Sequence, residues 1–391
     1  MTTAADGTTG RYLVLLEDDW TDATSELNRV AGIRTADTAD GEPSALWEAD
    51  GLLMSELGVA LVNADEEQVT ALARAVDEPG PIALIEPERY VQAIEPTAPS
   101  TDAEAPTVDE TLFTWGLQAT GAPNSTATGE GIKLAVLDTG FDLKHPDFAD
   151  RTVVSASFVQ GEEVQDGHGH GTHCIGTSCG PRELDSGPGY GVAYKSDIYV
   201  GKVLSNEGSG ADGGILSGID WAITNGCAVV SMSLGAPTEK GQAFSRTYER
   251  VATRALQKGT LIIAAAGNES DRRVGRINPV GHPANCPSIM AVSAIDVARK
   301  MAWFSCGTVD TIGAVDLTGP GVDVYSSWPV PLRYKRISGT SMATPHAAGV
   351  AALIAQATGA RGLELWARLS QLSRRLPLPG TDVGAGLVQA P

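Results

Sequence analysis

The pattern of apolar and polar positions divides the chain into two parts with different orders of strands and helices. Over residues 11–95, apolar runs predict the order strand, helix, two strands, helix and strand. The second helix, expected at residues 65–76, is amphipathic, because its apolar residues recur on one face: Val69, Leu72, Ala73 and Val76. This order is typical of a small ferredoxin-like α/β domain, which we expect at residues 11–95 after a polar tail at residues 1–10.

From residue 111 onward, short buried runs alternate with helical patterns. Strands are expected at residues 132–137, 198–204, 227–234, 261–266 and 289–294, and helices at residues 214–224 and 249–257. Such alternation is typical of an α/β domain with a mostly parallel sheet and helices on both faces, here over residues 111–391. Residues 96–110 are rich in proline, threonine and acidic residues and lack periodicity, so we expect an exposed linker with a processing site.

Several polar residues stand where this fold places ligands and reactive groups. Asp138, Ser233 and Asn268 follow buried strands, and ligands bind beyond the carboxyl ends of parallel strands. Ser341 precedes an apolar helical run, with Pro345 expected in its first turn. The free N–H groups of a helix start stabilise negative charge beside such a serine. An ordinary N-cap serine has the same local pattern, so this stretch alone does not identify a nucleophile.

Together, four residues provide the groups that nucleophilic catalysis requires. The hydroxyl of Ser341 is a poor nucleophile until a neutral imidazole, such as that of His170, takes its proton. A carboxylate such as that of Asp138 must hold the imidazole in the correct tautomer. The oxyanion that develops needs fixed donors, which the side chain of Asn268 and the backbone N–H of Ser341 can supply.

Three motifs in this order resemble the signatures of the subtilisin-like serine proteases, or subtilases. They are Asp-Thr-Gly at 138–140, His-Gly-Thr-His at 170–173 and Gly-Thr-Ser-Met-Ala-Thr-Pro-His at 339–346. The resemblance covers roughly residues 111–391. It implies that Asp138 orients His170, that His170 is the general base and acid, that Ser341 is the nucleophile and that Asn268 is the oxyanion donor.

The resemblance also assigns roles to neighbouring residues. It implies that His173 is structural. Cys174, directly after His173, resembles the proteinase K-like branch of the family, and it is either a small buried hydrophobe or a reactive thiol.

Two further segments resemble the substrate-binding strands of this family. They are Gly208-Ser209-Gly210 and Ser231-Met232-Ser233-Leu234-Gly235. An extended peptide would add between them as a β-strand, and main-chain pairing of this kind favours broad specificity. Glu269 would lie at the rim of the pocket for the residue whose carbonyl is attacked. We hypothesise that its carboxylate favours basic or polar side chains there.

The N-terminal domain resembles the inhibitory propeptide of subtilases. The resemblance implies a zymogen that cleaves itself near residues 95–110, with its own N-terminal domain as an intramolecular inhibitor. A permanently attached accessory domain is the alternative. For the whole protein, the sequence predicts a serine endopeptidase that acts on peptides or proteins. A peptide-processing or transpeptidating enzyme of a biosynthetic pathway would use the same residues, and a non-catalytic scaffold is the other alternative.

Structural calcium is the cofactor that the resemblance implies. Asp147 matches a family ligand position, and a second site would use the carbonyls of Pro287 and Ile289 with the carboxylate of Asp316. Asp316 is equally well interpreted as a turn residue. The family's asparagine-rich calcium loop is not recognisable.

Organic cofactors and catalytic metals are not expected. Gly208, Gly210 and Gly213 form a GxGxxG pattern, but no acidic residue ends the next strand, which argues against a dinucleotide site. His168, His170 and His173 lack the HExxH spacing of catalytic zinc sites.

Charge and cysteine content limit the partners and the compartment. The formal net charge of −20 argues against nucleic acid and anionic membranes, and we expect a monomer. Five cysteines without a CxxC spacing argue against structural zinc, and at least one thiol stays outside any intramolecular pair. Without a recognisable signal peptide, the sequence predicts a cytoplasmic protein if it is complete and a secreted one if a leader has been removed.

Overall fold

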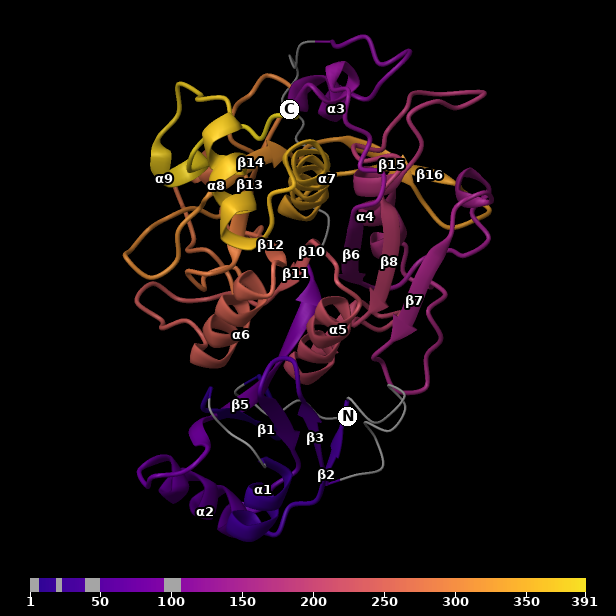
Figure 1. Ribbon diagram of the computed structural model, residues 1–391. Coiled ribbons are helices and arrows are strands. Elements are labelled where there is room, and N and C mark those ends of the chain that lie inside the picture. Colours follow the sequence, from indigo (N-terminus) through magenta and orange to yellow (C-terminus); the bar gives the residue numbers. More distant parts are fainter. Residues whose placement is uncertain (1–6, 19–22, 39–49, 95–106) are drawn as a thin grey trace.

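The computed structural model describes residues 7–18, 23–38, 50–94 and 107–391. A smaller N-terminal domain, at the bottom of Figure 1, packs against a larger C-terminal domain. Most of the predicted linker therefore lies outside the described residues. Among those that are described, no helix combines the length and the apolar character needed to span a bilayer.

The N-terminal domain contains the predicted order of elements, with one additional short strand. Its elements are β1 (Thr8–Leu16), α1 (Ala23–Ala31), β2 (Thr35–Asp37), β3 (Gly51–Met54), β4 (Val59–Val62), α2 (Glu66–Val76) and β5 (Ile82–Ala93). The strands form one sheet in the order β5-β1-β4-β3-β2. Leu27 of α1 and Leu72 of α2 are fully buried in the core between the helices and this sheet. Asp65 caps α2 through a capping box with Gln68.

Two boundaries of this domain differ from the prediction. The sheet begins at Thr8, within the predicted polar tail, because Thr8 pairs with Arg89 of β5. The sequence pattern also predicts a strand at residues 81–85 and a further stretch of sheet at residues 90–94. They form the single strand β5, because β1 supports its first half and the C-terminal domain its second half.

The C-terminal domain is built on a parallel sheet of seven strands, which confirms the predicted α/β fold. The order is β14-β13-β12-β10-β6-β8-β7, and every neighbouring pair is parallel. The strands are β6 (Lys133–Asp138), β7 (Val153–Ser157), β8 (Asp197–Lys202), β10 (Val229–Met232), β12 (Leu261–Ala265), β13 (Met290–Ile295) and β14 (Leu317–Pro320). Apart from the edge strand β7, their interiors are almost wholly buried, as expected for a sheet that is covered on both faces.

Helices cover the two faces of this sheet. α4 (His170–Cys179) and α7 (Thr340–Thr358) pack in one apolar core, and α5 (Asp212–Thr224) and α6 (Arg246–Gln257) pack in another on the opposite face. Figure 1 shows α7 in the middle of the domain. The remaining elements are α3 (Trp115–Thr120), α8 (Gly362–Leu372), α9 (Gly380–Val383), the hairpin β15 (Val324–Ser327) and β16 (Tyr334–Ile337), and the short strands β9 (Ser209–Ala211) and β11 (Leu234–Gly235).

Pro345 does not lie in the first turn of its helix, contrary to the sequence prediction. α7 begins at Thr340, so Pro345 is inside the helix. A proline has no N–H, and the carbonyl of Ser341, four residues earlier, therefore has no helical donor. That carbonyl instead accepts hydrogen bonds from Ser233 Oγ at 2.8 Å and Cys174 Sγ at 3.6 Å. The break is tolerated because side chains of neighbouring segments replace the missing donor.

Candidate active site

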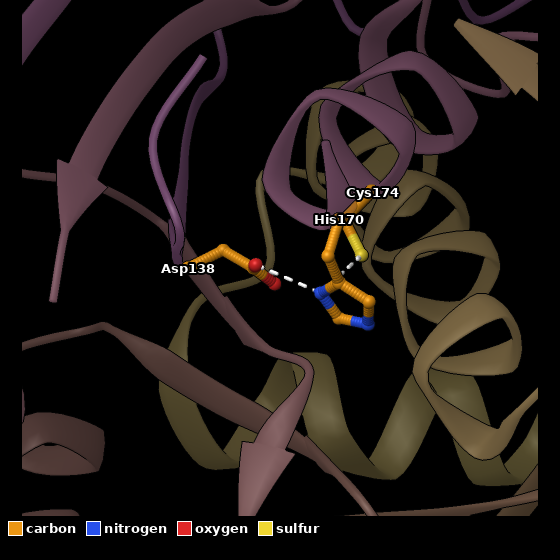
Figure 2. A group of neighbouring side chains, drawn as sticks. All are labelled: Asp138, His170 and Cys174. Atoms are coloured by element: carbon orange, nitrogen blue, oxygen red, sulfur yellow. Dashed lines mark hydrogen bonds and ion pairs between the residues drawn. The ribbon is translucent and has the colours of Figure 1, made fainter. Parts of the chain in front are cut away.

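Asp138 and His170 form a buried hydrogen-bonded pair at the carboxyl end of the parallel sheet. β6 ends at Asp138 and α4 begins at His170. His170 Nδ1 lies 2.8 Å from Asp138 Oδ1, and both side chains are almost completely buried (Figure 2). Because a carboxylate can only accept, Nδ1 carries the hydrogen, and in the neutral ring Nε2 keeps its lone pair. No described residue forms a hydrogen bond with Nε2, so that atom is available to accept a proton.

Asp166 fixes the loop that carries His170, a role that the sequence analysis did not identify. Its Oδ1 accepts from the backbone N–H groups of His168 and Gly169 at 3.0 and 2.8 Å. Its Oδ2 accepts from the N–H and the hydroxyl of Thr172 at 2.9 and 2.7 Å. The signal that could have revealed it is an aspartate placed directly before a glycine-rich helix start.

The surroundings of His170 favour its charged form. Burial opposes a charge on the ring, but the carboxylate of Asp138 outweighs this effect and raises the pKa of His170 well above its usual value of 6.5. The neighbouring His173 differs. Burial lowers its pKa to about 3, and its Nε2 lies 3.0 Å from the carbonyl of Val324. Its contacts thus agree with the structural role that the sequence predicts for His173.

Cys174 lies beside the His170 ring, as Figure 2 shows. Its Sγ is 3.9 Å from His170 Nδ1 and 3.6 Å from the carbonyl of Ser341. Burial raises the pKa of this thiol, so it stays protonated at neutral pH. All five cysteines are buried and free.

Ser341 stands in the first turn of α7, as predicted, and its hydroxyl points at the end of the N-terminal domain. Oγ donates to the carbonyl of Ile94 at 3.0 Å and lies 3.3 Å from the carbonyl of Ser233. Among the described residues, Ser341 Oγ makes no hydrogen bond to His170. Nucleophilic attack would require the hydroxyl to turn from these carbonyls toward Nε2.

Asn268 is fixed beside the start of α7. Its Oδ1 accepts from the backbone N–H and the hydroxyl of Thr340, each at 2.9 Å. Its Nδ2 lies only 3.0 Å from the position that a Cβ on Gly339 would take. The amide group is therefore held with its N–H₂ toward the segment that carries Ser341, and a larger residue at position 339 would crowd it.

The predicted substrate-binding segments flank the last residues of β5. Gln92, Val91 and Tyr90 pair antiparallel with β9 on one side, and Ala93 and Gln92 pair with β11 on the other. Hydrogen bonds from Ala93 N to Gly208 O and from Ile94 N to Ser233 O continue the two ladders. Figure 1 shows β5 running from the N-terminal domain to β11. A strand of this chain thus occupies the groove predicted for peptides.

Two of the predicted groove residues lie elsewhere. Ser231 and Met232 belong to β10, inside the parallel sheet, and they pair with β6 and β12 rather than with β5. The segment bends after Met232, so only Ser233, Leu234 and Gly235 reach the groove. Glu269 is held against Gly267, and one of its oxygens accepts from Cys306 Sγ at 3.1 Å.

The two predicted calcium sites differ in how well their residues suit a cation. Both carboxylate oxygens of Asp147 accept hydrogen bonds, from Tyr190 OH at 2.6 Å and from Tyr334 OH at 3.0 Å. Arg333 lies 3.4 Å away as a further donor. Three donors, one of them a cation, already surround this carboxylate, so Asp147 fits the predicted role poorly.

Asp316 suits a cation better. Its carboxylate accepts from Ala291 N at 2.8 Å, and burial raises its pKa to about 7. Within the described parts of the chain, no basic side chain pairs with it. A buried carboxylate whose charge is poorly compensated is a hard oxygen donor of the kind that suits calcium.

Comparisons with known proteins agree with this geometry. The subtilase family matches residues 129–372, which include all four residues of the site. The chain is 41% identical over 261 residues to an M-protease of Shouchella clausii (strain KSM-K16), covering 65% of this chain and 62% of that protein. It is 39% identical over 261 residues to subtilisin DY of Bacillus licheniformis, covering 66% of this chain and 86% of that protein. It thus spans less than two thirds of the M-protease. The chain belongs to the subtilase family.

Proposed function

We propose that this protein is a serine endopeptidase that hydrolyses peptide bonds through an acyl-enzyme on Ser341. One observation carries the proposal most directly. β5 lies as a third strand between β9 and β11 and brings the carbonyl of Ile94 to 3.0 Å from Ser341 Oγ. An extended peptide that binds in the same way would place its scissile carbonyl at the nucleophile.

In the first half-reaction, His170 Nε2 takes the proton of the Ser341 hydroxyl while Oγ attacks the carbonyl carbon. Asp138 holds the ring in the required tautomer and stabilises the imidazolium. The imidazolium then gives its proton to the leaving amine as the C–N bond breaks. Water deacylates the enzyme by the same sequence, with His170 again as base and then as acid.

The oxyanion of each tetrahedral intermediate forms next to the start of α7. We assign its stabilisation to the Nδ2 of Asn268 and the backbone N–H of Ser341. Thr340 supports the assignment, because its two hydrogen bonds to Oδ1 fix the direction of the Asn268 amide before substrate arrives. Donors that are fixed in advance need no reorganisation during the reaction.

We further propose that the N-terminal domain is an inhibitory propeptide that the enzyme removes itself. Two carboxylates of β5 support the docking, since each accepts from the free N–H groups at a helix start. Glu86 accepts from the N–H groups of Arg246 and Thr247 at α6, and Glu88 accepts from Gly213 N at α5. The position of Ile94 favours the Ile94–Glu95 bond as the cleavage site, at the edge of the predicted range.

A fluorophosphonate probe tests the activity itself. We expect the mature protein to become labelled at Ser341 and to release peptides with new carboxyl termini from a peptide library. Added amine nucleophiles should compete poorly with water. Efficient transfer to amines would instead support the peptide-processing alternative, and absence of labelling would support the scaffold.

The docking of the N-terminal domain should weaken as the pH rises. Asp220 of α5 is buried at the interface, where Thr38 donates to it at 2.9 Å, and burial raises its pKa to about 6 from 3.8. The docked form binds the proton of Asp220 more tightly than the separated form does, so protonation of Asp220 stabilises docking. This stabilisation is complete below about pH 4 and is lost as the pH rises through about 6. We expect dissociation of the cleaved domain to accelerate roughly tenfold between pH 5 and 8.

Asp220→Asn is the matched variant, because its amide oxygen can still accept from Thr38 but does not titrate. Its dissociation rate should lose most of this increase, as measured by size-exclusion chromatography or by the recovery of activity at each pH. Equal pH dependence in the wild type and the variant would contradict the role of Asp220.

Calcium removal should lower thermal stability through the site at Asp316. With calcium at about 100 times its dissociation constant, binding stabilises by about 2.7 kcal/mol, so a chelator should lower the melting temperature by about 5–10 °C. Asp316→Asn should remove this sensitivity, whereas Asp147→Asn should keep it. A chelator without effect on the wild type would refute the calcium site that Asp316, Pro287 and Ile289 are proposed to form.

A further inference from the structure

A second buried polar cluster lies beside the groove, at the end far from Ser341. It consists of Asp212, Tyr248 and His282, whose exposed fractions are 2%, 0% and 2%. Asp212 is the first residue of α5 and directly follows β9. The rings of Tyr248 and His282 meet edge to face at 4.7 Å. None of these residues takes part in the proposed reaction.

The cluster holds one carboxylate oxygen and presents the other to β5. Asp212 Oδ1 lies 3.0 Å from Tyr248 OH and 3.1 Å from His282 Nε2. Asp212 Oδ2 accepts from the backbone N–H of Arg89 at 2.9 Å. In the described part of the chain, that N–H of the bound strand is the only hydrogen-bond donor to Oδ2.

The register of β5 defines which residue of a bound peptide this contact recognises. If Ile94 is the residue whose carbonyl is attacked, Arg89 is the sixth residue, counted from Ile94 toward the N-terminus. The ladder between β5 and β9 ends with the pair Tyr90 and Ala211. The side chain of Asp212 adds one more main-chain contact beyond this ladder.

We propose that Asp212 is a binding site for the main-chain N–H of the sixth residue of extended peptide substrates. The inference rests on the proposed endopeptidase function and deepens it. When the N-terminal domain leaves, Oδ2 loses its donor, and a substrate strand in the same register restores it. The contact requires a backbone N–H, so it accepts every residue except proline and favours substrates with at least six residues before the scissile bond.

The fixed carboxylate makes this contact stronger than an ordinary main-chain pair. Hydrogen bonds to a charged acceptor are roughly twice as strong as neutral ones, and burial limits competition from water. Tyr248 and His282 fix the rotamer, so substrate binding does not have to order the acceptor. The preference therefore depends on peptide length and backbone, not on side-chain identity.

The test compares two peptides that differ in a single atom. One is an all-amide peptide with seven residues before the scissile bond, and the other has an α-hydroxy acid at the sixth position, so that an ester oxygen replaces the N–H. A peptide with only four residues before the scissile bond measures whether the enzyme is catalytically competent. For the mature wild type, we expect kcat/KM to be about tenfold or more higher for the amide than for the ester. Asp212→Ala should bring this ratio close to one.

Two further variants separate the contact from general damage. Tyr248→Phe removes one support of the carboxylate and should reduce the ratio partly, while Asp185→Ala, an exposed carboxylate outside the groove, should keep the wild-type ratio. If Asp212→Ala does not fold, Asp212→Asn is used, and its neutral amide should also lower the ratio. Equal cleavage of amide and ester by the wild type overturns the inference and leaves the endopeptidase function intact. Failure to cleave any peptide, the four-residue one included, overturns both.

Discussion

Ser341→Ala is expected to abolish both peptide hydrolysis and the shortening of the chain. Loss of the nucleophile in serine proteases of this type costs on the order of 10⁶-fold in kcat. The variant keeps the fold, because the backbone of Ser341, not its hydroxyl, accepts from Ser233 and Cys174. Intact mass spectrometry should show the full 391-residue chain for the variant and, for the wild type, fragments that separate after Ile94.

The control for this experiment is Ser370→Ala in α8, a serine outside the groove whose hydroxyl donates to the carbonyl of Trp366 in its own helix. It should be processed like the wild type. If pure Ser341→Ala were still cut after Ile94, another protease would be responsible. The N-terminal domain would then not be removed by its own enzyme, although Ser341 could still be tested with peptides.

Asp138→Asn should have the second largest effect, a loss on the order of 10⁴-fold in kcat. An asparagine amide can donate to Nδ1, which stabilises the tautomer that carries its hydrogen on Nε2. That tautomer cannot take the proton of Ser341.

The dependence of activity on pH reports separately on how the charge of Asp138 changes the pKa of His170. His170 works as a base only when neutral, so activity is lost as the pH falls through its pKa. Asp138 holds this pKa above 6.5, and the acid limb of kcat/KM should therefore lie above that value in the wild type and move to lower pH in Asp138→Asn. A flat wild-type profile down to about pH 4 would contradict the role of His170.

The sequence predicted the parts of the site that depend on local structure. Asp138 ends a buried strand, His170 begins a helix and Ser341 lies in the first turn of another, and each of these features is visible within a few residues of the chain. The alternation of strands and helices placed Asp138 at the carboxyl edge of the sheet, and the resemblance to subtilases implied that His170 and Ser341 act together with it. The parallel sheet and the ferredoxin-like order followed from the same periodicity.

Contacts between distant segments could not be predicted in this way. β5 is one continuous strand because β1, β9 and β11 each support a different part of it, and β9 and β11 lie more than a hundred residues away. The bend after Met232 and the donors that replace the N–H missing at Pro345 are also properties of the packed chain. The roles of Asp147 and Asp212 depend on tyrosines that the sequence places far from them.

The strand in the groove belongs to the same chain as the nucleophile, which sets the kinetics of activation. Its effective concentration at Ser341 does not depend on how much protein is present. The first cut should therefore be first order, with a half-time that does not change on dilution. The second stage differs, because the severed domain can rebind, and its escape depends on total concentration. Dilution should accelerate the appearance of activity without accelerating cleavage.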